Sequence, residues 1–399
     1  MRRFLERMRA GATGRSAGWL SLLASLTGCA GAVQPSAGAS DASSAGPSAS
    51  AQRGAPAVAS ASREEAAKPE TGSAAGPATK PGTVAGGLAR GTGTAADRAL
   101  LAGDRALDAD DLDGARRAYL RALELGPEDP AARVGLVRVA VAATGIETTY
   151  AGAPDHPKLK ELRRELETIR QLDAEYGPVH LELGRVLLIL GQAVAARHSL
   201  RQAARSLPGD AEAHSALGVA LLATGDKPGA LRQLRRASEL DPENADRLAN
   251  LGAAYLSMGQ VSDAIRVYSR AVARDPTDAR INGDLGTAYL AANEPHRAMP
   301  YLQKAVELAP GRATFLSNLG YAHQAVGKYD QAAATYRRAL ALDDHLVEAW
   351  INLGTVYAKQ RHYGEARRAL ERALSLSPDD PRAKANLAEL DQLTRGRHP

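Results

Sequence analysis

The chain has 399 residues, of which 24% are charged and only 4% are aromatic, and its formal net charge is +5 with a pI near 9.3. Such basicity would suit a nucleic-acid or membrane-surface protein. Residues 1–28, however, hold five arginines against one glutamate, which leaves a net charge of +1 for the rest of the chain. We therefore expect no nucleic-acid partner. The abundance of small residues favours closely packed helices.

The first 28 residues have the pattern of a targeting signal. An arginine-rich start is followed by a short apolar run over 19–26, well below the roughly 20 residues that span a bilayer. We predict that 1–28 is removed and plays no part in the fold.

Cys29 follows this signal and is the single cysteine of the chain, which excludes an intramolecular disulfide. The run Leu26-Thr27-Gly28-Cys29 resembles the lipobox of bacterial lipoproteins. The resemblance implies that Cys29 is acylated, with palmitate among its chains, and anchors the protein to a membrane. It also implies an outer-membrane lipoprotein facing the periplasm, because residues 30–32 lack the aspartate that retains such proteins at the inner membrane. An ordinary secretory signal cut after Ala30 or Ala32, or a structural thiol, stays an alternative.

Residues 29–95 are rich in Ala, Gly, Ser, Pro and Thr and show neither helical nor strand periodicity. With so few bulky apolar side chains the segment cannot offset its ordering entropy. We predict a disordered tether after the lipidated cysteine, with an r.m.s. span of roughly 45 Å, and expect it to act as a spacer.

The folded part is predicted to begin with one repeat unit at 96–129. A second, irregular unit follows at about 130–176, with helices near 131–143 and 158–175. Between them an inserted loop over 144–157 carries Tyr150, Asp155 and His156. Interrupting loops often bind partners, but a plain surface excursion is the preferred reading of this one.

From residue 177 a Leu-Gly pair returns every 34 residues, which indicates stacked supersecondary units. The glycines are Gly184, Gly218, Gly252, Gly286, Gly320 and Gly354. Each regular unit reads as helix, short turn, helix. In the unit 246–282, apolar residues at helical spacing surround Gly252, Gly259-Gln260 marks the turn, and Asp275-Pro276 ends the second helix. Neither helix could bury its apolar face alone, so the units must stack.

The repeat pattern resembles the tetratricopeptide repeat. The last regular unit shows the motif in the residues Trp350, Leu353, Gly354, Tyr357, Ala366, Leu370, Ala373 and Pro378. The resemblance covers 96–380 and implies an all-α, right-handed superhelical solenoid of about eight helix-turn-helix repeats. Asp344 replaces a motif proline, His323 replaces a tyrosine, and Pro300 lies inside an expected helix, where it removes a hydrogen bond or shifts the helix start. Residues 381–399 read as an amphipathic capping helix and tail, with Ala385, Leu387, Leu390 and Leu393 on its apolar side.

The sequence holds no arrangement typical of catalysis. It has no paired histidines on a helix face, no nucleophile elbow and no phosphate-binding glycine loop. We therefore expect no enzyme, no cofactor, no metal and no small-molecule substrate.

In the resembled family the first helices line a concave groove. One groove position, two residues before each glycine from Gly252 onward, reads Asn250, Asp284, Asn318 and Asn352, and Asn386 follows in the capping helix. An asparagine amide matches the donor and acceptor of a peptide backbone, so a row of them could hold an extended chain. The alternative is that these asparagines only support the helix surface. Arg280 and Tyr321 are neighbouring groove candidates.

The sequence thus predicts a membrane-anchored scaffold or adaptor that holds protein partners or extended peptide segments. The expected setting is the assembly of an envelope complex, in pilus or secretion systems or in peptidoglycan-enzyme recruitment. Lipoproteins of this plan resemble pilotins and assembly factors of type IV pili. Two alternatives remain open: a self-associating structural envelope protein, and an accessory subunit of a partner enzyme.

Overall fold

The computed structural model describes residues 87–146 and 149–395. The predicted signal at 1–28, Cys29 and the tether up to residue 86 lie outside these residues. Within them the chain forms helices and no β-strand. The helices are α3 (Ala95–Asp108), α4 (Leu112–Leu125), α5 (Pro130–Ala142), α6 (Pro157–Leu172), α7 (Gly177–Ile189), α8 (Ala193–Ser206), α9 (Ala211–Ala223), α10 (Lys227–Leu240), α11 (Ala245–Ser257), α12 (Val261–Arg274), α13 (Ala279–Ala291), α14 (Pro295–Leu308), α15 (Ala313–Ala325), α16 (Tyr329–Leu342), α17 (Val347–Lys359), α18 (Tyr363–Leu376) and α19 (Pro381–Arg395).

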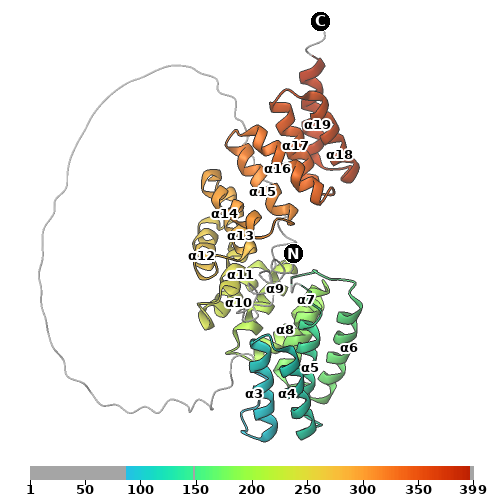
Figure 1. Cartoon of the computed structure of the whole chain (residues 1–399), viewed down its shortest axis with the longest axis vertical. Coiled ribbons are helices and arrows are strands. Elements are labelled where there is room, and N and C mark those ends of the chain that lie inside the picture. The colour runs from blue at the N-terminus through green and yellow to red at the C-terminus, as the bar shows by residue number, and fades with distance from the viewer. Residues whose placement is uncertain (1–86, 147–148, 396–399) are drawn as a thin grey trace, which may run out of the picture. The chain divides into compact units, whose positions relative to one another are not determined.

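These helices form eight antiparallel pairs, from α3/α4 to α17/α18, and α19 follows as a single helix (Figure 1). Each helix packs on the next in chain order. Successive first helices, such as α11, α13 and α15, also contact one another directly. Helices on the inside of a curved stack lie closest together, so the first helices form the inner row and the second helices the outer row. The predicted all-α solenoid is confirmed.

Local chemistry sets where the helices begin and end. The side chains of Asp210 and Asn244 cap α9 and α11 by accepting hydrogen bonds from the N–H groups of Ala213 and Arg247. Inside a pair, the first helix usually ends at a residue with left-handed backbone, and Gly259 adopts φ 74° there. Capping residues and left-handed residues therefore recur with the 34-residue repeat, and so do the ends of the helices.

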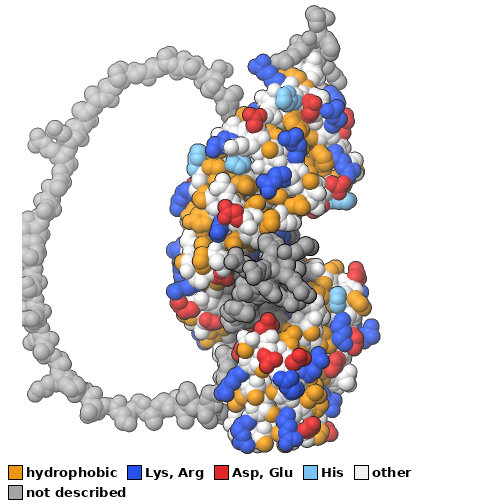
Figure 2. All heavy atoms as spheres, in the orientation of Figure 1, with side chains coloured by type: hydrophobic (Ala, Val, Ile, Leu, Met, Phe, Trp, Pro, Cys, Tyr) orange, Lys and Arg blue, Asp and Glu red, His pale blue; other side chains and the backbone are white. Residues whose placement is uncertain are grey.

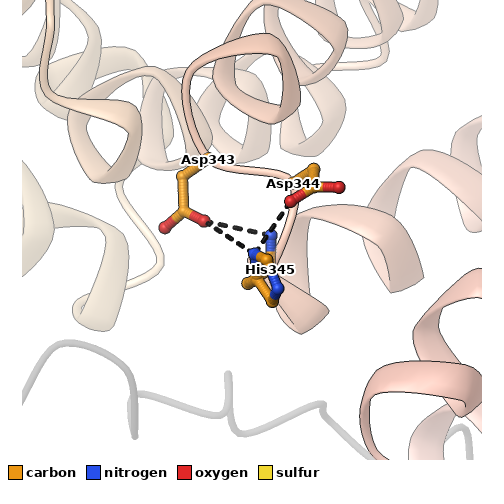
Figure 3. A group of neighbouring side chains, drawn as sticks. All are labelled: Asp343, Asp344 and His345. Carbon is orange, nitrogen blue, oxygen red and sulfur yellow. Dashed lines mark hydrogen bonds and ion pairs between the residues drawn. The ribbon is translucent and has the colours of Figure 1, made fainter.

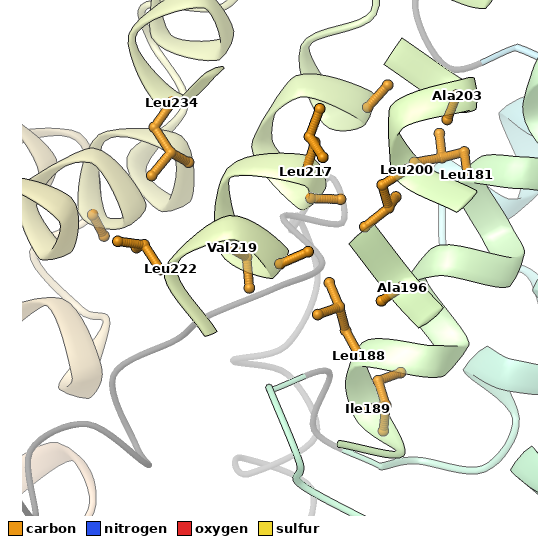
Figure 4. Close-up of a cluster of buried hydrophobic side chains, with 14 of the residues drawn as sticks. Leu181, Leu188, Ile189, Ala196, Leu200, Ala203, Leu217, Val219, Leu222 and Leu234 are labelled. Atoms are coloured by element: carbon orange, nitrogen blue, oxygen red, sulfur yellow. The ribbon is translucent and has the colours of Figure 1, made fainter. Parts of the chain in front are cut away.

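The repeat glycine marks the closest approach of the two helices in a pair. A Cβ built on Gly252 would lie 2.8 Å from the ring of Tyr268, which is fully buried. In neighbouring units the same place is filled by leucines, including Leu200 and Leu234, which extend into the core between α7, α8, α9 and α10 (Figure 4). Only hydrogen fits at the glycine, so the pair spacing is fixed there.

The inserted loop of the second unit lies against α7. The N–H groups of Ala151 and Ala153 donate to the carbonyls of Leu188 and Ile189 at 2.9 and 3.2 Å. The loop thus gives the Leu188 carbonyl a second donor besides the N–H of Gly191, and it supplies a donor to the Ile189 carbonyl at the C-terminal end of α7. Tyr150 packs against the core, whereas Asp155 is exposed and pairs with Lys160.

The folded part begins before the predicted boundary at residue 95. Leu88 is only 1% exposed, and its N–H donates to Asp104 Oδ2 at 2.9 Å. The predicted tether is therefore wrong for residues 87–94. The sequence shows one leucine among small and polar residues, and it does not show that the first repeats hold a buried site for that leucine.

Pro300 does not shift the start of its helix. α14 begins at Pro295 and continues through Pro300. Pro300 is exposed, so the carbonyl that loses its partner can face water.

In the capping helix α19, Leu390 is 2% exposed and Ala383 is fully buried. Ala385 and Leu393 are exposed instead of packed as predicted.

Both signs of charge are interspersed on the face shown in Figure 2. Many exposed arginines of the second helices pair one turn away, as Arg236 does with Glu239 at 3.4 Å. Pairs of this kind contribute little to stability but keep a surface soluble. Among the described helices, none is long and apolar enough to cross a membrane.

We predict that Gly252→Ala lowers the free energy of unfolding by about 1–3 kcal/mol, because the added methyl group must displace the buried Tyr268 ring. Gly364→Ala is the matched control: it also lies in a helix, but nothing lies within 4 Å of its built Cβ. The control should be neutral or stabilising by up to about 1 kcal/mol. Urea unfolding followed by circular dichroism measures both. Equal midpoints for the two variants would contradict this account of the glycine.

Candidate functional site on the inner face of the repeats

We define the inner face as the first-helix side chains that lie six and two residues before, and one residue after, each repeat glycine. In α19, where Ala388 takes the place of the glycine, the same spacing applies. Side chains at these places meet their counterparts in the next unit, which shows that they lie on one continuous side of the inner row. All predicted groove residues belong to this face.

Two of the predicted asparagines make the same contact to the preceding unit. Asn318 Nδ2 donates to Thr287 Oγ1, and Asn386 Nδ2 donates to Thr355 Oγ1, both at 3.0 Å. Each threonine hydroxyl in turn donates to a carbonyl of its own helix. Both asparagines are half-buried. Their amino groups therefore link adjacent repeats, and no donor among the described residues lies within hydrogen-bond distance of their Oδ1 atoms.

The other two asparagines differ. Asn250 is 3% exposed, and its Nδ2 donates to Ser215 Oγ at 3.3 Å. Asn352 is half-buried. It lies in α17, one unit after Tyr321, which is an inner-face residue of α15. Tyr321 packs beside the buried cluster of α16 and α17 that contains Tyr336 and Leu353. The aromatic ring thus contributes apolar surface between Asn318 and Asn352.

Arg280 and Asp284 come together in the sixth unit. The guanidinium of Arg280 pairs with Asp246 of the preceding unit and lies 3.5 Å from Asp284 Oδ2 and 3.8 Å from Asp278 Oδ2. Asp284 is 4% exposed, and burial raises its pKa to about 7, with Arg280 opposing the shift and Asp278 adding to it. Arg280 therefore joins two repeats through Asp246, whereas the Asp284 carboxylate is buried and is not an open groove surface. In the same register, Arg382 pairs with Glu348 at 3.4 Å.

Sequence reasoning missed a row of buried charges on the first helices of the N-terminal half, which includes the inner-face residues Asp104, Glu182, Arg185 and Glu212. Arg138 Nε lies 2.6 Å from Glu182 Oε1, and its NH1 lies 3.6 Å from Asp104 Oδ1. Arg185 NH1 approaches the same Glu182 oxygen at 3.1 Å, and its Nε lies 4.0 Å from Glu212 Oε1. The row continues to Arg247, which pairs with Glu212 at 3.6 Å.

Burial and the neighbouring arginines together set the pKa values of the carboxylates in this row. Burial raises the pKa of Glu212. For Glu182 burial acts in the same direction, but Arg185 and Arg138 outweigh it and lower the pKa. α5 is apolar except for Arg133 and Arg138. A charged residue such as Arg138 in so apolar a helix is the sequence signal that could have indicated a buried partner.

The turn between α16 and α17 brings Asp343, Asp344 and His345 together (Figure 3). His345 Nδ1 lies 2.8 Å from Asp344 Oδ1, and the His345 N–H donates to Asp343 Oδ1. All three residues are exposed, and Arg372 binds Asp344 at 2.9 Å. These contacts explain the group as a turn that replaces the missing motif proline.

The geometry suits binding more than chemistry, because the inner face offers amide acceptors, hydroxyl groups and paired charges. Family profiles described as tetratricopeptide repeat match residues 100–144, 181–245, 221–283, 255–314 and 311–379. The chain belongs to the tetratricopeptide repeat family.

Several solved structures are similar to this chain, and one of them, with a TM-score above 0.5, supports the fold. The chain of the APC/C hetero-tetramer Cut9–Hcn1 is similar at 17% identity and a TM-score of 0.58 over 74% of this tetratricopeptide chain, which spans 56% of that chain. Pseudomonas aeruginosa PilF is similar at 20% identity and a TM-score of 0.48, covering 54% of this chain and 98% of that one. YrrB, a tetratricopeptide protein with an unusual peptide-binding site, has 23% identity and a TM-score of 0.40, covering 47% and 97%. No curated protein sequence matches the chain.

We predict that Asp284→Asn stabilises the tetratricopeptide array more at pH 8 than at pH 5. The folded-state pKa of Asp284, about 7, lies above the ordinary value of 3.8. The folded state therefore binds the extra proton between these values, and its stability falls as pH rises through that window. Asparagine cannot ionise and therefore avoids this loss of stability. The size of the loss follows from the pKa difference between the folded and unfolded states and is on the order of a few kcal/mol.

Thermal unfolding of both proteins at the two pH values measures the effect. Glu239→Gln is the control, because Glu239 is an exposed carboxylate on the outer helix α10. A gain from Asp284→Asn that is the same at pH 5 and pH 8 would contradict the raised pKa.

Proposed function

We propose that the inner face of this array is a protein-binding groove that holds an extended partner segment. Tetratricopeptide repeats supply the general basis, since they form protein-interaction scaffolds. The observation that carries the proposal is the orientation of Asn318 and Asn386, whose amino groups bind threonines while their Oδ1 atoms have no donor among the described residues. A backbone N–H of a partner is the donor that fits such an acceptor.

The spacing of the repeats favours an extended partner. Packed helices lie about 8–10 Å apart, and an extended chain advances about 3.3 Å per residue. One repeat therefore corresponds to about three residues of the partner. Asn318 and Asn386 lie two repeats apart and would meet N–H groups about six residues apart, which point to the same side of an extended chain, without reading the side chains between them. Tyr321, which lies between two such acceptors, adds an apolar contact for a partner side chain.

The proposed setting is the bacterial envelope. There the protein would be a scaffold in assembling a pilus or secretion complex, or in recruiting a peptidoglycan enzyme, rather than an enzyme itself. This part of the proposal rests on the resemblance of Leu26-Thr27-Gly28-Cys29 to a lipobox. Acylation of Cys29 would hold the array at the outer membrane, facing the periplasm.

Replacing Asn318, Asn352 and Asn386 by alanine should reduce the yield of a partner crosslinked in cells by about tenfold or more, because each lost acceptor weakens the partner by about 0.5–1.5 kcal/mol. Crosslinking followed by mass spectrometry identifies and measures the partner. The double variant Thr287→Val/Thr355→Val is the control, since it breaks the inter-repeat bonds of Asn318 and Asn386 but leaves the amides in place. Undiminished recovery of the partner by a folded triple variant would rule out the groove proposal.

The anchor is tested separately. Cys29→Ser should abolish palmitate incorporation and release the protein from the outer-membrane fraction, because no thiol remains to be acylated. Metabolic labelling and membrane fractionation measure the two effects. A Cys29→Ser protein that still carries label and still sediments with the outer membrane would show that the anchor assignment is wrong.

A further inference from the structure

Residues 87–93 lie on the N-terminal repeats as a bound peptide would. Leu88 is held at three points. Its side chain is buried in the core cluster, its N–H donates to Asp104 Oδ2 at 2.9 Å, and its carbonyl accepts from the hydroxyl of Tyr176 at 2.9 Å. Asp104 belongs to the inner face, directly after the glycine of the first unit. Both backbone groups of one residue are therefore recognised by side chains of the array.

The Asp104 carboxylate is also held by contacts that do not involve Leu88. Tyr119 donates its hydroxyl to Asp104 Oδ1 at 2.8 Å, and Arg138 lies 3.6 Å from the same oxygen. The other carboxylate oxygen remains for the Leu88 N–H. A preorganised acceptor of this kind binds without further ordering.

Arg90 is the second anchor, two residues after Leu88. Its NH2 lies 3.2 Å from Asp129 Oδ1 and 3.2 Å from Asp173 Oδ2. Its guanidinium also lies 4.6 Å from the ring centroid of Tyr176. Asp129 precedes α5 and Asp173 precedes α7, so the two carboxylates come from the turns before two successive first helices. Two carboxylates and an aromatic face favour a planar guanidinium over an ammonium group.

The end of the segment turns into α3. Asp97 accepts hydrogen bonds from the N–H groups of Arg90, Thr92 and Gly93. The three contacts close the segment immediately after Arg90. The part of the chain that lies across the repeats in extended form is therefore short and centred on Leu88-Ala89-Arg90.

We propose that Asp104, Tyr176, Asp129 and Asp173 form a second recognition site, specific for an extended segment in which an apolar residue precedes an arginine by two positions. The chain fills this site with its own Leu88-Ala89-Arg90. A protein partner that carries the same motif binds there by displacing it. The site does not depend on the asparagine groove, since it lies on the first three repeats and reads side chains as well as backbone.

The competition favours the chain's own segment. A segment joined directly to α3 acts at an effective concentration in the millimolar range. A partner with one copy of the motif therefore binds weakly until the segment is released. Exchange at this site would couple partner binding to the release of residues 87–93 from the first repeats.

The test uses the full-length protein and a fluorescent peptide of residues 86–94, which contains the motif. Fluorescence anisotropy should show at least about tenfold tighter binding to the variant Leu88→Ala/Arg90→Ala than to the wild type, because the variant no longer fills the site. A peptide with lysine in place of Arg90 should bind the variant about tenfold more weakly. Adding Asp129→Asn/Asp173→Asn to the variant should abolish binding, which distinguishes this site from the groove.

A double variant that keeps its helical circular dichroism but does not bind the peptide would overturn the proposal. Equal binding of the arginine and lysine peptides would overturn its specificity. If the double variant loses helical signal, Arg90→Ala is used instead, because it leaves Leu88 in place. It should bind the peptide more tightly than the wild type and exchange the Leu88 amide hydrogen faster. No change in either measurement would also overturn the proposal. The alanine variant of the three groove asparagines should bind the peptide like the wild type.

Discussion

The contact between each repeat glycine and one side chain of the second helix is the constraint on which the array depends. Where Gly252 meets Tyr268, or Gly354 meets Leu370, no methyl group fits between the helices. This contact sets the distance between the helices of a pair. Pairs of equal spacing can stack regularly, and regular stacking is what buries the apolar face that no single pair could bury alone. The inner face is a consequence, since its side chains lie in register only if the spacing repeats.

The polar side chains of the inner face mostly connect one repeat to the next. Asn318 binds Thr287, Arg280 binds Asp246, and Arg382 binds Glu348, and each contact crosses a repeat boundary. In the N-terminal half the connection is a row of alternating charges through Glu182 and Arg185. Buried ion pairs add little net stability compared with apolar packing. Their value here is register, because a shifted unit would leave an uncompensated buried charge.

The sequence predicted what depends on period and missed what depends on pairing between distant residues. Glycine spacing predicts the helix pairs, whereas the groove role of the asparagine positions stays a prediction. The asparagine amides were expected to face a partner with both donor and acceptor, yet the donors bind threonines one repeat away. A contact of this kind joins residues 31 positions apart, and the sequence pattern gives no sign of which hydroxyl is in reach. The burial of Leu88 was missed for the same reason, since its partners Asp104 and Tyr176 are 16 and 88 residues away.

The two halves of the inner face therefore differ in what they leave for a partner. From α3 to α11 each carboxylate of the charged row already has an arginine, and Asp104 is committed to the segment at 87–93. A ligand there must compete with contacts that the chain makes to itself, which favours a specific motif over general binding. From α15 to α19 the asparagine acceptors have no such competitor among the described residues, so this half can accept backbone N–H groups with little selection. In the two proposals, selectivity at one end and permissive binding at the other follow from the same 34-residue period, because the repeat fixes the positions and the side chains placed there decide how much each position demands of a partner.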